Sequence, residues 1–451
     1  MTATKKHTLD LTQGSILKQM LTFLLPLFLS TLVQQLYNSA DRMVVGQFSG
    51  KLALAAVGST GYPTNLLLNM VVGLSTGANV IIANFRGAKN EPDTRKAMHT
   101  AMTLSLLGGV VLLLLGTTLS GPILQWMNTP ADTIALSTLY MRIIFCGTPF
   151  SMIYNFGSSI MRAHGDTKRP MTILIVSGIA NVVLNFVFVV FCHMSVEGVA
   201  LATIISQAIS ASWVVCILLD PKDIYRLNVK ELKLYKTVTR LILHTGIPCG
   251  INAALLPFAS LFLQSSINSF GSLVLAGSSA SDSLTNLAAT GITSMASTCT
   301  SFAGQCYGAQ KYKRIRQSVY VALGIGLVMQ GTYLLACIFF RTQLISIFTS
   351  DPDVLKYATS KTILVMIGYV FSICAQVFLN TLRGMRISGI TTVMSVFSVC
   401  VVRLVWIWII FPLHPTVEFL YFCFPVSFIC NFLLQGITYL FYRNRLLTQE
   451  V

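Results

Sequence analysis

Charged residues are scarce in this sequence, and acidic residues are the scarcest. Of 451 residues, 10% are charged and only 15 are Asp or Glu, whereas 54% are hydrophobic and the mean hydropathy is +0.71. A soluble domain of this length needs far more polar surface than this composition supplies. The composition therefore excludes a soluble globular protein and indicates a protein of the lipid bilayer.

The sequence also lacks the patterns of disulfide frameworks, metal sites and hydrolytic centres. Its eleven cysteines lie almost wholly within apolar runs without a Cys-x-x-Cys pair, and its six histidines show no ligand spacing. No nucleophile with a convergent base is visible. We therefore predict that the protein is not an enzyme and needs no cofactor. The polar N-terminal segment shows no cleavage site of a signal peptide, so we expect none.

Long apolar runs fill most of the chain instead. At ~1.5 Å per residue, a helix of about 20 residues crosses the ~30 Å hydrocarbon layer of a membrane, and most of these runs are that long. They predict an all-α integral membrane protein with twelve transmembrane helices, at residues 16–48, 52–83, 97–119, 134–161, 171–192, 197–219, 241–268, 273–304, 318–340, 357–382, 389–412 and 418–441.

The basic residues predict how these helices are oriented. If the N-terminus is inside, 24 of the 31 Lys and Arg residues fall on the cytoplasmic side of the twelve spans, as the positive-inside rule requires. We therefore expect a multi-pass protein of the cell membrane with both termini in the cytoplasm. The net charge of +16 is a topology signal, and no aromatic-basic surface segment supports a nucleic-acid partner.

The second half of the chain repeats the first at an offset of 221 residues. This offset aligns Thr64-Asn65-Leu66 with Thr285-Asn286-Leu287, and Gly87-Ala88 with Gly308-Ala309. Because each half has an even number of spans, both copies enter the membrane from the same side. We therefore predict two pseudo-symmetric six-helix bundles, related by an axis along the membrane normal.

The repeat also sets the predicted domain boundaries. We expect a cytoplasmic N-terminal segment at 1–15, an N-terminal lobe at 16–219, a polar and basic cytoplasmic linker at 220–236, a C-terminal lobe at 237–441 and a cytoplasmic tail at 442–451. Two equivalent bundles that face each other leave a cleft at the pseudo-axis. This architecture is typical of secondary transporters that work by alternating access.

Asp41 is the most informative residue of the first predicted span. A carboxylate at the centre of a bilayer costs about 2.5 kcal/mol or more, so an acid in a span is by default a site hypothesis. A second interpretation is an interfacial residue at a helix end, since Arg42 follows directly. The apolar residues Met43, Val44 and Val45 favour the embedded position.

Short motifs spread over nearly the whole chain point to a family. They begin with the apolar first helix, which contains Pro26, Asp41 and Gly46. The other motifs are Arg86-Gly87-Ala88 with Arg95 and Lys96, MRAHGDTKRP at 161–170, Asn181 and Asn185 in the fifth span, EGVALATIISQ at 197–207, GQCYGA at 304–309 and FPVSF at 424–428. In order and spacing, this set resembles the MATE (multidrug and toxic compound extrusion) transporters.

The resemblance implies an exporter that exchanges organic, often cationic and amphipathic, compounds for Na⁺ or H⁺. In several members of the family an acid of the first helix, two polar residues of the fifth and a threonine of the sixth hold the coupling cation. Here these would be Asp41, Asn181, Asn185 and Thr203. Many relatives carry an acid where this chain has Asn185, so the choice between Na⁺ and H⁺ stays open.

Counting residues along the helices places these four side chains at a similar depth. Asp41 follows Lys18 by 23 residues, about 35 Å of helix, which places it in the outer half of the membrane. The same counting places the two asparagines and Thr203 in the outer half of their spans. Oxygen ligands of this kind suit a hard monovalent cation, and Asp41 could instead carry a proton. The alternative is that the asparagines and the threonine only hydrogen-bond helices to one another.

The second lobe has no counterpart of Asp41 but carries Asp282 and Arg403, each about ten residues from the outer end of its span. Two interpretations stay open: the two residues form a buried ion pair, or Asp282 faces the cleft as a counter-charge for cationic substrates. Polar residues within spans are candidates for lining the cleft, namely Gln34, Asn65, Gln264, Asp282, Asn286 and Gln376.

We therefore predict a secondary active multidrug efflux antiporter that works by alternating access. Its partners would be small organic substrates, Na⁺ or H⁺ and the lipid bilayer, and we expect a monomer. The alternative is a flippase of lipid-linked precursors from the same wider superfamily, although such proteins usually have a more cationic cleft and extra spans. A channel is disfavoured because no re-entrant selectivity filter is visible in the sequence.

Overall fold

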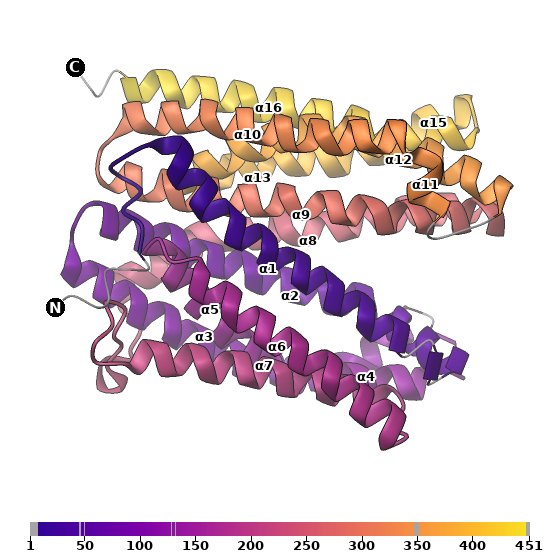
Figure 1. Cartoon of the computed structure of the whole chain (residues 1–451), viewed down its shortest axis with the longest axis horizontal. Coiled ribbons are helices and arrows are strands. Elements are labelled where there is room, and N and C mark those ends of the chain that lie inside the picture. Colours follow the sequence, from indigo (N-terminus) through magenta and orange to yellow (C-terminus); the bar gives the residue numbers. More distant parts are fainter. Residues whose placement is uncertain are drawn as a thin grey trace. The chain divides into compact units, whose positions relative to one another are not determined.

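The structure is a computed structural model, and it describes residues 8–44, 47–48, 50–127, 129–130, 132–346 and 351–447. These residues form helices joined by short connections, and no strand occurs among them. Within each half of the chain, neighbouring helices lie lengthwise side by side (Figure 1). The predicted all-α fold is confirmed.

The first half supplies the helices of the first six predicted spans. Its fourth span is bent by 43° between α4 and α5, where Gly147 and Pro149 interrupt the helical hydrogen bonds. The elements are α1 (Ile16–Val44), α2 (Gly50–Gly87), α3 (Glu91–Trp126), α4 (Ile134–Cys146), α5 (Thr148–Ala163), α6 (Lys168–Phe186) with η3 (Val187–Phe191), α7 (Val196–Leu219) and the short η4 (Val229–Glu231).

The second half supplies the other six. Its eleventh span is a continuous series of short α, π and 3₁₀ segments. The elements are α8 (Lys236–Asn268), α9 (Ser272–Gly308), α10 (Tyr312–Phe339), α11 (Arg341–Ser346), α12 (Pro352–Gly384), α13 (Gly389–Ser395), η5 (Val396–Val401), α14 (Val402–Val405), η6 (Trp406–Ile410), η7 (Phe411–Leu413), α15 (Val417–Tyr421) and α16 (Cys423–Leu447).

Most of these helices are suited to a bilayer by length and composition. Nine spans in the described part are long and apolar enough to cross a membrane, and α4 with α5 makes a tenth. The two remaining predicted spans coincide with α8 and α9, which have 33 and 37 residues. Serine, threonine, alanine and glycine make up much of α9, so this helix is long but weakly apolar.

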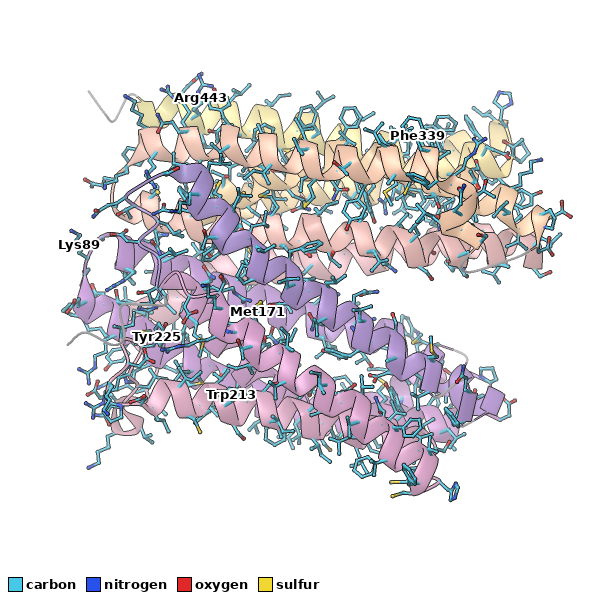
Figure 2. All side chains as sticks on the ribbon, viewed as in Figure 1. Lys89, Met171, Trp213, Tyr225, Phe339 and Arg443 are labelled. Carbon is cyan, nitrogen blue, oxygen red and sulfur yellow. The ribbon has the colours of Figure 1, made fainter. Side chains whose placement is uncertain are left out.

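Large apolar side chains cover the outer faces of many helices. Trp213 on α7 and Phe339 on α10 are examples (Figure 2), and Phe339 is 73% exposed. Such surfaces would be unfavourable in water and are stable against lipid tails.

The chain divides into two compact units. Unit 1 contains the described residues of Met1–Asp10 and of Leu25–Gly250, and unit 2 contains those of Leu11–Leu24 and of Ile251–Val451. In unit 2, the Arg314 guanidinium donates to the carbonyl oxygens of Leu11, Gln13 and Gly14 at 2.8–2.9 Å, which attaches the segment 11–14 to this unit. The helices α1 and α8 each contribute residues to both units.

The turns of the two units repeat one another in detail. Lys89 in unit 1 and Gln310 in unit 2 both have a φ of 55°, and they are 221 residues apart. Gly165 and Arg386, at φ 88° and 65°, are separated by the same offset. These matched left-handed residues end equivalent helices in equivalent ways, as the sequence repeat predicts.

The predicted linker packs closely on unit 1. Tyr225, 1% exposed, donates to the buried carboxylate of Asp166 at 2.8 Å, and burial together with this carboxylate raises the pKa of the Tyr225 phenol. Arg169 pairs with Asp223, and the Asn228 N–H donates to His99 Nε2 at 2.9 Å. Lys89 and Tyr225 lie at the same end of unit 1 (Figure 2), where the sequence analysis places the cytoplasm.

Four glycines bring α2 and the first part of α8 into backbone contact within unit 1. A Cβ on Gly73 would lie 2.2 Å from Gly250 Cα, and a Cβ on Gly77 would lie 2.5 Å from Gly246 Cα. Each helix thus carries a Gly-x-x-x-Gly pair, which lets helices approach closely in membranes.

We predict that Gly73→Ala destabilises the protein by about 1–3 kcal/mol, because the new methyl group meets backbone atoms that cannot move aside. Gly58→Ala on the same helix is the control, since a Cβ there meets no atom within 4 Å. Thermal unfolding of both variants in detergent is the measurement. Equal midpoints for the two variants would contradict the close crossing.

Candidate functional site

Helix packing in unit 1 brings Asp41 of α1 against α6. Gly178 of α6 lies beside Tyr37 of α1, where a Cβ would be 3.2 Å from the Tyr37 ring. One turn further along α1, Asp41 accepts a hydrogen bond from the Asn185 amide through Oδ1. Asn185 Nδ2 also donates to Asn181 Oδ1 at 3.2 Å, as their i, i+4 spacing allows.

The two asparagines retain unused hydrogen-bonding capacity. Asn181 and Asn185 are 1% and 0% exposed, while Asp41 is partly buried. Asn185 Oδ1 and Asn181 Nδ2 have no hydrogen-bond partner among the described residues. Buried polar groups are almost always satisfied, so an unpaired oxygen beside a carboxylate suits an ion or a water.

Thr203 is the fourth predicted member of this cluster. Its hydroxyl donates to Val199 O of its own helix α7 at 2.9 Å. None of the hydrogen bonds in the described part of the chain joins Thr203 to Asp41, Asn181 or Asn185. The structure thus brings three of the four predicted residues together by direct contacts.

Asp282 of α9 has a partner that the sequence analysis did not single out. Lys361 of α12 contacts Asp282 Oδ1 at 2.6 Å and donates to Ser278 Oγ at 2.5 Å. The Lys361 side chain is 2% exposed, whereas that of Asp282 is 49% exposed. Lys361 lies inside the predicted span 357–382, and a lysine within a span indicates a nearby acidic partner.

Of the two interpretations left open for Asp282, the ion pair with Arg403 has no supporting contact among the described residues, where Asp282 pairs with Lys361. Among the described residues, Arg403 donates from Nε to Ser427 Oγ at 3.1 Å, and its guanidinium carbon lies 5.0 Å and 5.2 Å from the ring centres of Phe424 and Phe428. Aromatic faces attract a cation, so this cage stabilises the buried arginine. Counting residues along each span predicts the depth of both residues, but it does not predict the direction in which each side chain points.

The other candidate cleft residues have diverse environments. Gln34 donates to the Tyr37 hydroxyl at 3.4 Å, and Gln376 accepts from Asn380 at 2.8 Å through Oε1. Asn65 of α2 and Asn286 of α9 are both exposed, and they occupy equivalent positions of the repeat. Gln264 is partly buried.

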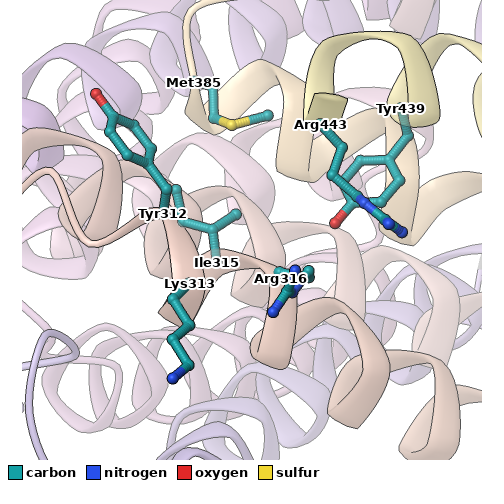
Figure 3. A pocket seen from close by; sticks show the side chains of 7 residues that line it. All are labelled: Tyr312, Lys313, Ile315, Arg316, Met385, Tyr439 and Arg443. Atoms are coloured by element: carbon teal, nitrogen blue, oxygen red, sulfur yellow. The ribbon is translucent and has the colours of Figure 1, made fainter. Parts of the chain in front are cut away.

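A small pocket in unit 2 lies away from these polar side chains. Residues of α10 and α16, together with Met385, form its walls (Figure 3). The lining residues are Tyr312, Lys313, Ile315, Arg316, Met385, Tyr439 and Arg443. All its charged groups are basic and lie at the end of the unit that is predicted to be cytoplasmic, so we interpret it as part of the basic cytoplasmic surface.

We predict that removing Asp282 costs more stability than removing Lys361. Asp282→Asn leaves a buried ammonium without its counter-ion, a change that typically costs about 3–5 kcal/mol. Lys361→Met leaves a half-exposed carboxylate, which water can solvate. Thermal unfolding of the two purified variants tests this order. A larger loss in Lys361→Met would contradict the burial of the pair.

Comparison with known proteins places the chain in a family. The sequence model of the MatE family matches residues 26–187 and 248–409, so the family unit occurs twice and covers more than half of the chain. The chain is 29% identical over 393 residues to the probable multidrug resistance protein YoeA of Bacillus subtilis (strain 168), with 85% of each covered. It is 22% identical to the multidrug export protein MepA of Staphylococcus aureus (strain MSSA476), with 77% of each covered.

A solved structure gives the same fold. The chain is similar to the outward-facing conformation of a multidrug resistance MATE family transporter of the MOP superfamily, with a TM-score of 0.92, 20% identity, and coverage of 99% of this chain and 100% of that one. This similarity confirms the predicted twelve-helix membrane fold. The double match confirms that the second half of the chain repeats the first. The chain belongs to the MatE family, which is a family of membrane transporters and not of enzymes.

Proposed function

We propose that this transporter exports organic compounds, including drugs, in exchange for Na⁺ or H⁺. The main support is the contact of Asp41 with Asn185 inside a membrane span, next to an amide oxygen that has no partner among the described residues. The multidrug names of the two bacterial relatives support the substrate class. Alternating access of the two repeats, in a monomer, would convert cation binding into export.

The coupling step would use the charge of Asp41. Asn185 is a neutral partner, so its hydrogen bond stabilises the carboxylate without cancelling the charge. A cation that binds Asp41 and Asn185 Oδ1 neutralises the cluster, and a proton on Asp41 would do the same. Either event changes the charge that the cluster carries inside the membrane, and this change is how the free energy of binding can favour one conformation over another.

We predict that Asp41→Asn abolishes cation-driven efflux while the protein still folds, because the amide keeps the size of the side chain and deletes its charge. Efflux of tetraphenylphosphonium from vesicles, with a Na⁺ gradient or a pH gradient imposed separately, is the measurement. Asp132→Asn, at an exposed position, is the control and should retain efflux. Efflux from Asp41→Asn at the wild-type rate would contradict the proposal, and so would a wild-type protein that responds to neither gradient.

We further propose that the protein lies in the cytoplasmic membrane with both termini inside. In a Cys-free background, Lys89→Cys and Lys313→Cys should then resist impermeant thiol reagents added to intact cells. Trp126→Cys, at a residue that is 86% exposed near the opposite end of α3, should react and serves as the control. Labelling at position 89 or 313 from outside would overturn this topology.

A further inference from the structure

The exposed face of α9 differs from that of α10, which belongs to the same unit. Among the described residues of α9, Leu273 at the very start is the one large apolar side chain that is exposed. By contrast, α10 exposes Leu327, Val328 and Phe339 along its length. The exposed positions of α9 follow one helical stripe, namely Ser272, Ala276, Ser279, Ser283, Asn286 and Thr293.

A stripe of hydroxyl and amide groups is unsuited to lipid tails. Hydrocarbon offers no hydrogen bonds, so polar side chains within a span usually face protein or an aqueous path. Ser279 and Ser283 donate their protons to carbonyl oxygens one turn earlier on α9, at 2.9 Å and 3.1 Å. Their hydroxyl oxygens still have lone pairs, so the stripe mainly offers acceptors to a ligand.

Asp282 borders this stripe and is the exposed member of its ion pair. Lys361 lies beneath it, 2% exposed, and holds Oδ1. None of the described residues donates to the other carboxylate oxygen, Oδ2. Arg403 does not compete for a ligand at the stripe, because it is 3% exposed and lies between Phe424 and Phe428.

We propose that Asp282 is a substrate-recognition carboxylate and that Lys361 is its positioning residue. The ligand class is a hydrophilic amine, in which an ammonium N–H group donates to Oδ2 while the polar stripe contacts the rest of the molecule. The inference rests on the proposed transport function and narrows its substrate class. A lipophilic cation without N–H groups would gain little here, because it can neither donate to Oδ2 nor contact an exposed aromatic side chain on the stripe.

Binding to the purified full-length protein, without any gradient, tests this proposal. The probes are spermidine, a hydrophilic polyamine, and tetraphenylphosphonium, a lipophilic cation without N–H groups. The main variant is Asp282→Asn with Lys361→Met, because removing both charges strands neither. We expect its spermidine affinity to fall at least about tenfold, as the loss of one charged hydrogen bond typically causes. Its tetraphenylphosphonium affinity should stay unchanged.

Further variants separate positioning from folding. Lys361→Met alone should lower the ratio of spermidine to tetraphenylphosphonium affinity in folded protein, and Lys361→Arg should restore it. Asp353→Asn, which removes an exposed acid at the start of α12, is the matched control and should bind both probes like the wild type.

Three results would overturn the proposal: wild-type protein that does not bind spermidine, a folded double variant that binds it as the wild type does, or an equal loss of both probes. Failure here is distinct from failure of the proposed function. If gradient-driven efflux of tetraphenylphosphonium persists in the wild type and requires Asp41, the transport proposal stands without this site. If the wild type shows no such efflux, the transport proposal fails whatever the binding result.

Discussion

A carboxylate inside a membrane needs a partner, and the two units meet this requirement with different chemistry. In unit 1 Asp41 accepts a hydrogen bond from the amide of Asn185, a neutral donor that does not itself cancel the charge of a carboxylate. In unit 2 the partner of Asp282 is the ammonium of Lys361, so the charge is balanced within the protein. A neutral partner leaves a site that an external cation can complete, whereas Lys361 occupies Oδ1 of Asp282 and leaves Oδ2 to a ligand that donates a hydrogen bond.

This difference lies on a common backbone. The left-handed residues Lys89 and Gln310 end equivalent helices, and Gly165 and Arg386 do the same at the next matching turn. Yet the position of the second unit that corresponds to Asp41 is Leu263, 222 residues on because the repeat has a one-residue gap between the first helix and the second, and Leu263 packs in an apolar cluster. The two units therefore end their equivalent helices at matching positions, but they differ in the polar side chains that lie inside those helices.

The sequence predicted the helices and their depth well, because apolar length and basic ends are properties of single segments. It also predicted that Asn181 and Asn185 lie on one face of their helix, since i, i+4 spacing is fixed by helix geometry, and that they lie at a depth similar to that of Asp41. It did not predict Lys361 as the partner of Asp282. Depth along a span follows from counting residues, but the rotation of α9, α12 and α14 about their axes depends on packing between segments distant in sequence. For the same reason the aromatic cage of Arg403 was not foreseen.

Two limits of the units fall inside helices, between Leu24 and Leu25 of α1 and between Gly250 and Ile251 of α8. A third, between Asp10 and Leu11, precedes α1, and none lies in the linker. Pro26 stands just after the first limit, and Pro248 just before the second. A proline removes one main-chain hydrogen bond and pushes the preceding turn apart, so it lowers the bending stiffness of a helix at that point. The linker is held within unit 1 by Asp166, Arg169 and His99. The two helices that continue from one unit into the other, α1 and α8, therefore each do so beside a proline that lowers their resistance to bending.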